Sequence, residues 1–330
     1  MAESQVSPAP AAVERPDASR SVLPGGSNAA WTAVGVLALV VLPFLVYPVF
    51  AMKVLCFALF AAAFNLLIGY VGLLSFGHAA FFGGAAYVAA HAVKVWGLTP
   101  EVGIVLGAAF AAVLGVLVGF LAIRRQGIYF SMITLALAQM FFFLCLQVPY
   151  TGGEDGIQGV PRGFLFGVID LSDPLPMYYT TLAVFLFGVF AIYRIVHSPF
   201  GNILKAIREN ENRAISLGYR VERYKLAAFV MSAALAGLAG GTKAIVFQLA
   251  TLTDVGWQMS GEVILMTLLG GIGTMVGPMI GAALVVTLQN YLASSAFPVT
   301  VLIGAIFVIC VLLFRKGIVG ELLAYLERRR

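Results

Sequence analysis

The feature that most constrains this chain is a series of long stretches almost without charged side chains. Several of them exceed the roughly 18 residues that an α-helix needs to cross a bilayer. Hydrophobic residues make up 61% of the 330 positions, and charged residues only 11%. The stretches do not alternate between apolar and polar residues as membrane strands do. The sequence therefore predicts an all-α, polytopic membrane protein.

Ten apolar segments can be delimited, and we expect each to form a membrane-spanning helix. They lie near residues 31–51, 54–74, 76–95, 101–123, 128–149, 176–196, 226–249, 257–272, 275–293 and 296–314. Residues 1–29 are rich in Ala, Pro, Ser and Gly, so we expect a disordered cytoplasmic tail there. The transmembrane domain is then 30–316, and residues 317–330 form a cytoplasmic C-terminal tail.

Charged residues between the segments indicate the orientation, because Lys and Arg concentrate in cytoplasmic loops. Arg124 and Arg125 mark one short cytoplasmic loop, and residues 197–225 hold six basic residues against three acidic ones. Residues 150–175 hold four acidic residues and one arginine, so we expect them outside. With basic residues also at the C-terminal end, ten segments put both termini in the cytoplasm.

The segment 263–288 is ambiguous, because it is either one long helix or two helices broken at Gly270–Gly273. One helix would leave nine spans and place the basic C-terminus outside, against the charge rule. Two helices fit better, although the first would have only about 15 residues, too few to cross a core about 30 Å thick. Short, glycine-interrupted helices are typical of transporter sites. We expect an analogous break in residues 69–87, "GYVGLLSFGHAAFFGGAAY".

A few polar side chains inside or beside the apolar segments are candidates for a substrate path. They are Asn65, Tyr70, Ser75, His78, Gln139 and Thr274. An intramembrane histidine marks a functional site by default. The alternative for His78 is a ring that hydrogen-bonds backbone freed by Gly72 or Gly77. The alternative for Asn65, Tyr70, Ser75 and Gln139 is hydrogen bonding between helices.

Sequence patterns for catalysis or nucleotide binding are missing. The sequence has no HExxH motif and no His/Cys cluster, so we expect no metal site, no catalytic residue and no cofactor. It has no GxxxxGK[ST] loop, so energy for pumping must come from another subunit. Lys53, Lys94 and Glu262 lie near segment ends, which leaves no evident buried carboxylate for an ion-driven carrier. The net charge is +5, but the basic residues lie beside apolar segments and do not indicate a nucleic-acid partner.

The segment "TGGEDGI", residues 151–157, follows a span on the expected outer side. Its candidate contact residues are Thr151, Gly152, Gly153 and Asp155. They either meet a ligand or docking protein through exposed N–H groups and side-chain oxygens, or belong to an ordinary turn-rich loop.

Residues 198–220, "SPFGNILKAIRENENRAISLGYR", are unusually charged for this chain. Apolar residues at helical spacing predict an amphipathic helix over 198–218, with Pro199 in its first turn and Gly218 at its end. The acidic Glu209 and Glu211 disfavour simple adsorption to anionic lipid. The helix either lies among lipid headgroups or docks on a cytoplasmic partner.

Four motifs resemble the Liv-type permeases of branched-chain amino-acid ABC transporters, and the M-type subunit more than its H-type partner. They are residues 198–241, which begin with the charged segment and end in "SAALAGLAGG", "GLLSFGHAAFFGGAAY" (72–87), "TGGEDGI" (151–157) and "LLGGIGTMVGPMIGAAL" (268–284). They follow one another over about residues 31–316, so the resemblance covers most of the chain.

The resemblance implies a role for the charged helix. In such importers, a short cytoplasmic helix of the permease sits in a cleft on an ATPase subunit. By position, the contact residues would be Ala206, Ile207, Arg208, Glu209, Asn210 and Glu211.

The resemblance also implies an inner-membrane importer with several partners. These are a second permease subunit, two cytoplasmic ATPase subunits, a periplasmic solute-binding protein and an amino-acid substrate. A permease for urea or short amides is the alternative within the class. A secondary carrier that works without an ATPase is the alternative from another class, and an intramembrane enzyme would need a catalytic constellation that the sequence lacks.

The charge asymmetry of the loops predicts that residues 150–175 are external and residues 197–225 internal. Single reporter cysteines at Ser172 and Ser216 should therefore differ when intact cells are treated with an impermeant thiol reagent. We expect labelling at position 172 only. Labelling at position 216 and not at 172 would overturn the orientation.

Overall fold

The computed structural model of the protein describes residues 28–292, 301, 304–305, 308 and 317–321. The chain divides into two units, Met1–Ala38 and Leu39–Arg330. Helix α1 (Asn28–Leu45) begins in the first unit and ends in the second. Most of the expected N-terminal tail, most of the tenth expected span and most of the expected C-terminal tail lie outside the described residues.

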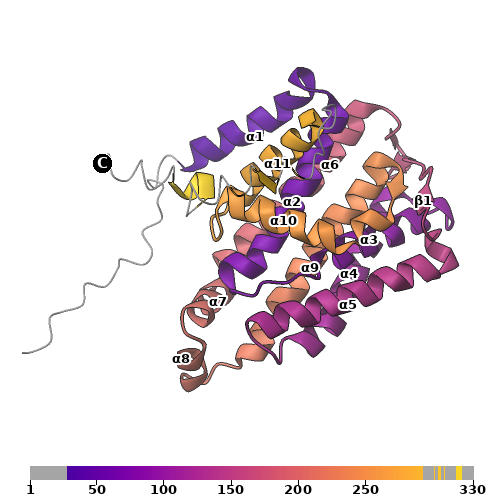
Figure 1. Ribbon diagram of the computed structural model, residues 1–330. Coiled ribbons are helices and arrows are strands. Elements are labelled where there is room, and N and C mark those ends of the chain that lie inside the picture. The colour runs from indigo at the N-terminus through magenta and orange to yellow at the C-terminus, as the bar shows by residue number, and fades with distance from the viewer. Residues whose placement is uncertain (1–27, 293–300, 302–303, 306–307, 309–316, 322–330) are drawn as a thin grey trace, which may run out of the picture. The chain divides into compact units, whose positions relative to one another are not determined.

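Helices dominate the described part of the second unit (Figure 1), and the expected all-α class is confirmed. After α1 come α2 (Pro48–Tyr70), α3 (His78–Lys94), α4 (Pro100–Ala122), α5 (Ile128–Gln147), α6 (Pro174–Val196), α7 (Pro199–Glu209), α8 (Glu211–Ser216), α9 (Val221–Phe247), α10 (Trp257–Gly270) and α11 (Gly277–Leu292). Proline stands in the first turn of α2, α4, α6 and α7. Its missing N–H costs nothing there, and its fixed φ suits the start of a helix.

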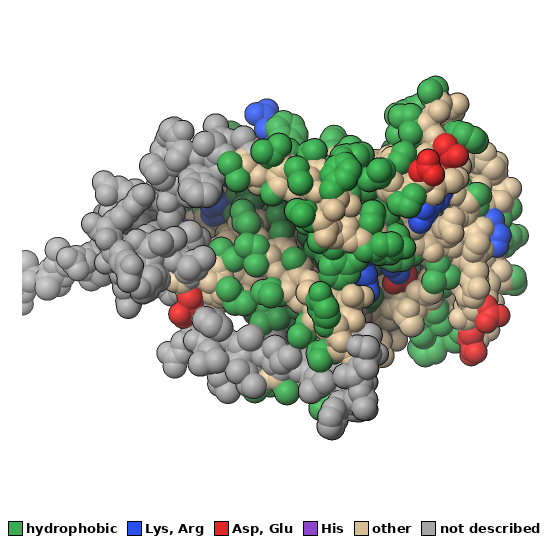
Figure 2. Space-filling view, turned by 90° about the horizontal axis from the view of Figure 1, so that it is seen from above, with side chains coloured by type: hydrophobic (Ala, Val, Ile, Leu, Met, Phe, Trp, Pro, Cys, Tyr) green, Lys and Arg blue, Asp and Glu red, His purple; other side chains and the backbone are tan. Residues whose placement is uncertain are grey.

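Helices α2 and α9 are the most buried of the long helices. Their strongest apolar windows are 83% and 72% buried, against 28% for α4 and α5 and 33% for α6. Helix α9 packs against α2, α3, α4 and α6, and α2 also packs against α10 and α11. Where α9 meets α3 most closely, Gly240 faces the backbone of Phe82 and leaves no room for a Cβ atom. Much of the surface seen in Figure 2 is hydrophobic, as lipid-facing side chains are.

Four strands of two residues each supplement the described helices. Strand β1 (Ile157–Gln158) pairs antiparallel with β4 (Leu249–Ala250), and β2 (Phe164–Leu165) pairs with β3 (Ile169–Asp170). The 3-10 turns η1 (Pro149–Thr151) and η2 (Leu252–Asp254) stand near the first pair in sequence. The β1–β4 pair joins the loop after α5 to the segment after α9, at the end of α9 remote from α7 and α8 (Figure 1).

Five described helices, α2, α4, α5, α6 and α9, are long and apolar enough to cross a membrane. Helices α3, α10 and α11 are shorter, with 17, 14 and 16 residues. The expected boundary between 31–51 and 54–74 is misplaced, because α1 ends at Leu45 and α2 starts at Pro48. Apolar residues run through this boundary, and only the proline reveals it.

The charged segment is two helices and not the single amphipathic helix that its spacing predicts. Ser198 caps α7 by accepting a hydrogen bond from the Gly201 N–H, and Pro199 occupies the first turn. At Asn210 the backbone is extended, with φ −156° and ψ 100°, and the Asn210 side chain accepts a hydrogen bond from the Arg213 N–H. Because asparagine is a favourable N-cap, it ends α7 and starts α8. Gly218, with φ +87°, follows α8 as expected.

Both glycine-rich segments that suggested breaks contain a non-helical stretch. The chain leaves helical form between α2 and α3, and again between α10 and α11. In the second break, Gly271 and Gly273 have φ values of +112° and +79°. L-residues with a side chain rarely adopt such angles, so glycine permits the break.

Asn65 of α2 holds the second break in place. Its Nδ2 donates to the Thr274 carbonyl oxygen at 2.8 Å, and its Oδ1 accepts from the Gly273 N–H at 2.9 Å. The side chain is almost completely buried. Thr274 Oγ1 donates to the Gly271 carbonyl and accepts from the Gly277 N–H, which closes the turn before α11. Non-helical backbone in the membrane thus obtains partners from side chains.

Replacing Asn65 with leucine, which has the same branched shape without hydrogen-bonding atoms, should destabilise the protein by about 2 kcal/mol or more, because two backbone groups lose their partners. The measurement is the thermal unfolding midpoint of the purified, detergent-solubilised protein. Gln139→Leu is the control, since Gln139 is half-buried on α5 and makes no hydrogen bond within the described residues. Equal midpoints for Asn65→Leu and wild type would contradict the fastening role of Asn65.

Candidate functional site

Arg208 of α7 reaches from the charged segment to both glycine breaks. Its Nη1 donates to the carbonyl oxygen of Gly69, near the C-terminal end of α2, where helix carbonyls lack helical partners. A methyl group on Gly72 would lie 3.2 Å from Arg208 Cγ, and one on Gly273 would lie 3.3 Å from Nη1. The methylene groups of the arginine therefore lie against Gly72 in the first break, and its guanidinium group lies near Gly273 in the second.

Besides Arg208, two of the expected coupling residues make contacts inside the protein. Ile207 is buried against Ala214 of α8 and Val221 of α9 in a small apolar cluster. Glu211 forms an ion pair of 2.6 Å with Lys225 of α9, whose side chain is only 5% exposed. Helices α7, α8 and the start of α9 are therefore joined by both apolar and ionic contacts. The sequence did not single out Lys225, because a lysine just before an apolar span looks solvated.

The other expected coupling residues face outward or shape the backbone. Ala206 and Glu209 are exposed on α7. Asn210 is also exposed, and its side chain caps α8. Exposed residues thus lie at the end of α7 and at the break, and they continue over residues 212–220, where Ala214 alone is buried.

His78, at the start of α3, is completely buried. Its Nε2 lies 2.9 Å from Ser232 Oγ, and Ser232 donates its hydroxyl proton to the Ala63 carbonyl at 2.6 Å. Because a serine has a single proton to donate, His78 Nε2 must carry the hydrogen of this pair. The partner is therefore a serine of α9 and not backbone freed by Gly72 or Gly77. Ser232 lies in a run of small residues that gave no signal of its own.

The other expected path residues are distributed over several elements. Asn65 and Thr274 come together in the second break, and Ser75 is buried in the first, where its Oγ accepts from the Gly77 N–H at 3.2 Å. Tyr70 is nearly buried, with Lys205 Nζ 5.9 Å from its ring centroid. Gln139 stands apart from this set on α5.

The segment 151–157 is held at the end of α5. Thr151 Oγ1 donates to carbonyl oxygens in the last turn of that helix and just after it. Gly152 and Gly153 have φ values of +76° and +60°, so glycine is needed for the turn. Asp155 is exposed. Of the expected contact groups, the Asp155 carboxylate is therefore open to solvent, whereas the Thr151 hydroxyl is used internally.

Charged residues within the helices are more prominent than the sequence suggested. Lys243 lies inside the span expected at 226–249, and its side chain is only 13% exposed. It is neutralised by Asp254, which is buried in η2. Only the fold brings these two residues together. Among the described residues, no group of three or more His, Cys, Asp and Glu side chains is arranged to hold a metal ion.

A family model described as "Branched-chain amino acid transport system / permease component" matches residues 49–314. The high-affinity branched-chain amino acid transport system permease protein LivM of Escherichia coli K12 is 27% identical over 77% of this chain and 65% of that protein. The probable branched-chain amino acid transport permease protein LivM of Methanocaldococcus jannaschii is 27% identical over 61% of this chain and 60% of that protein. The ribose import permease protein RbsC of Bacillus subtilis is 31% identical over 54% of this chain and 58% of that protein.

The chain spans about 65% of the length of the E. coli relative. No solved structure gives a significant match. The family model, however, covers well over half of the chain, and the long apolar helices agree with it. The protein is therefore a multi-pass membrane protein of the branched-chain amino acid transport system permease family.

Proposed function

We propose that this chain is the M-type permease subunit of an ATP-driven importer of branched-chain amino acids. It would lie in the inner membrane with about ten spans and with both termini in the cytoplasm. A second permease subunit, two ATPase subunits and an external solute-binding protein would complete the importer. The family match and the LivM relatives support this assignment.

The observation that carries the proposal is the contact of Arg208 with both glycine breaks. An ATPase subunit that binds the exposed end of α7 would move Arg208 together with that helix. Arg208 would then pull on Gly69, at the end of α2, and press on Gly273, ahead of α11. Asn65 already fastens the second break to α2, so the two breaks would respond together.

The contacts around α7 suit it to transmit force. The ion pair between Glu211 and Lys225 and the cluster around Ile207 join α7 and α8 to the first turn of α9. Helix α9 in turn packs against α2, α3, α4 and α6. A push on the charged segment would thus reach the most buried helices. A secondary carrier would have no use for such a link, which favours the ATP-driven reading.

The substrate assignment rests mainly on the relatives. The LivM proteins are named for branched-chain amino acids, whereas RbsC is named for ribose, so a likeness to permeases does not by itself identify a cargo. Leucine, isoleucine and valine are favoured, and urea or a short amide is the alternative cargo.

Complete importers in proteoliposomes, with the cognate binding protein, test the cargo. We expect ATP-dependent accumulation of labelled leucine, with isoleucine and valine as competitors. If labelled urea accumulates while the three amino acids neither accumulate nor compete, the substrate assignment is wrong and the importer assignment survives. Loss of ATP dependence would instead favour a secondary carrier.

Arg208→Met should uncouple the importer, since it removes the charged contact with Gly69 and keeps an unbranched apolar stem beside Gly72. Uptake should fall by about tenfold, which corresponds to a contact of about 1.4 kcal/mol. The ATPase subunits should still copurify, because Glu209 and Ala206 remain exposed.

Arg213→Met is the matched control, because Arg213 lies on α8 with an exposed side chain. Its uptake should equal that of wild type. Wild-type uptake by a well-expressed Arg208→Met importer would remove the proposed link between the charged segment and the breaks.

A further inference from the structure

A pocket of about 730 Å³ opens between α2, α9, α10 and α11. Phe57, Phe247, Leu265 and Val285 contribute apolar wall. Lys53, Lys243, Glu262 and Gln289 also line it, so charges of both signs meet an apolar surface. A mostly apolar pocket with a few convergent polar groups is the usual form of a small-molecule site.

The pocket lies far from the charged segment. Lys53 precedes Gly69 on α2 by 16 residues, which is roughly 24 Å along the helix. Lys243 likewise lies near the end of α9 that is remote from Lys225. In the proposed orientation, the pocket therefore belongs to the external half of the protein.

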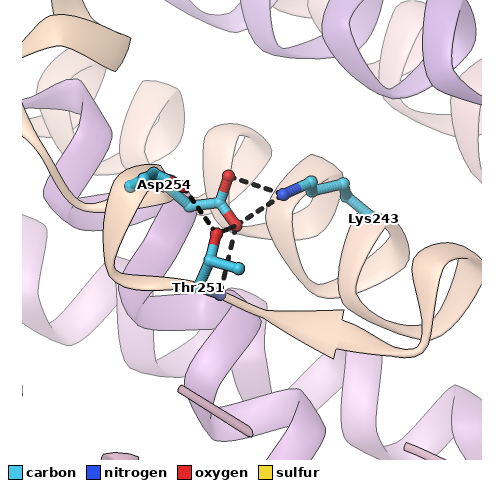
Figure 3. A network of polar contacts seen from close by, with 4 residues as sticks. Lys243, Thr251 and Asp254 are labelled. Atoms are coloured by element: carbon cyan, nitrogen blue, oxygen red, sulfur yellow. Dashed lines mark hydrogen bonds and ion pairs between the residues drawn. The ribbon is translucent and has the colours of Figure 1, made fainter. Parts of the chain in front are cut away.

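Lys243 contributes little free charge to this pocket. Its Nζ lies 2.5 Å from Asp254 Oδ1 and also contacts Oδ2 (Figure 3). The same carboxylate accepts a hydrogen bond of 2.9 Å from the Thr251 hydroxyl. Because the ion pair is nearly buried and fully bonded, the two charges neutralise each other. The pair serves as a fixed polar wall beside Thr251 and Thr253, which also line the pocket.

Among the lining residues that the structure describes, Lys53 and Glu262 are the remaining charges. Lys53 is half-buried and makes no hydrogen bond or ion pair with the part of the chain that the structure describes. Glu262 is also half-buried, and its Oε2 accepts from Gln289 Nε2 at 3.1 Å. The charges of Glu262 and Lys243 both act on Lys53. The pocket thus presents one cation and one carboxylate that do not form an ion pair with each other.

We propose that this pocket binds the zwitterionic cargo as it enters the permease, an inference that rests on the proposed function. The α-carboxylate of the amino acid would meet Lys53, and its α-ammonium group would meet Glu262. The branched side chain would lie against Phe57, Phe247 and Val285. Charge-assisted hydrogen bonds to both ends would recognise the backbone of the amino acid, and the apolar wall would select its side chain.

The charge pattern favours a zwitterion over the other cargoes. The charges of Lys53 and Glu262 sum to zero, as do those of Lys243 and Asp254. An anion could therefore pair only with Lys53, and a cation only with Glu262. Urea and ribose have no charge to pair with Lys53 or Glu262, and urea has no apolar group to pack against the apolar wall. Burying a charge without an opposite charge is costly. Within the described residues, Glu262 has only the neutral amide of Gln289 and Lys53 has no hydrogen bond, so a zwitterion would give each of them an opposite charge.

Ligand competition on the importer in nanodiscs, without the binding protein, tests the pocket. Saturation-transfer NMR would follow displacement of L-leucine by leucinamide, which lacks the carboxylate, by isocaproate, which lacks the amine, and by urea. In wild type, each single-charge analogue should bind about tenfold more weakly than leucine. Urea should not compete.

Two variants should each change a different ratio of affinities, that of leucine to leucinamide or that of leucine to isocaproate. Lys53→Met should abolish the preference for leucine over leucinamide and keep the preference over isocaproate. Glu262→Gln should do the reverse. Loss of fold would lower the binding of every ligand alike, so the ratios separate it from recognition. Lys94→Met and Glu101→Gln are controls outside the pocket and should leave both ratios at their wild-type values.

The outcomes separate the pocket from the proposed function. If leucinamide and isocaproate bind to wild type as tightly as leucine does, or if neither variant shifts its ratio, the pocket assignment is overturned. Uptake of leucine by the same preparation in proteoliposomes would then leave the proposed function standing. If the importer takes up urea and not leucine, the substrate part of the proposed function fails, and the pocket assignment fails with it.

Discussion

Backbone that leaves helical form inside a bilayer must find its hydrogen-bond partners within the protein, because lipid offers none. This constraint governs both glycine breaks. Asn65 supplies a donor and an acceptor to the break between α10 and α11, and Arg208 donates to the carbonyl of Gly69 beside the other break. The hydrogen bond of Arg208 to the Gly69 carbonyl therefore satisfies backbone near a break and also links that break to the charged segment. A residue that stabilises a break is also placed to move it.

The charged groups lie at two ends of the buried helices. At one end, Glu211, Lys225 and Arg208 join the segment α7–α8 to the helices. At the other end, Lys243 and Asp254 neutralise each other next to Lys53 and Glu262. Helices α2 and α9 run between the two ends. In an importer, the first set would receive the motion of the ATPase and the second would meet the cargo, so the two most buried helices would connect energy input to substrate.

Most helices could be predicted from the length of the apolar runs. The contacts of most candidate side chains could not be predicted in the same way. Pro48 and Asn210 show the limit for boundaries. Pro48 starts a helix inside a continuous apolar run, and Asn210 divides a segment whose helical spacing looks continuous, because each residue favours a helix start or an N-cap. His78 and Thr151 show it for sites. Each looked available in the sequence, and each side chain is engaged within the protein in the structure.

The sequence by itself determined the class of the protein, the glycine breaks and the family, because run length, glycine and motif order are local properties of the chain. The tertiary structure alone decided which polar groups meet. Asn65 and Thr274 are 209 positions apart, and Arg208 and Gly69 are 139 apart. No periodicity reports such pairs, because they depend on how separate helices pack. Lys243 lies inside an apolar span, and only the fold brings its partner Asp254 to it.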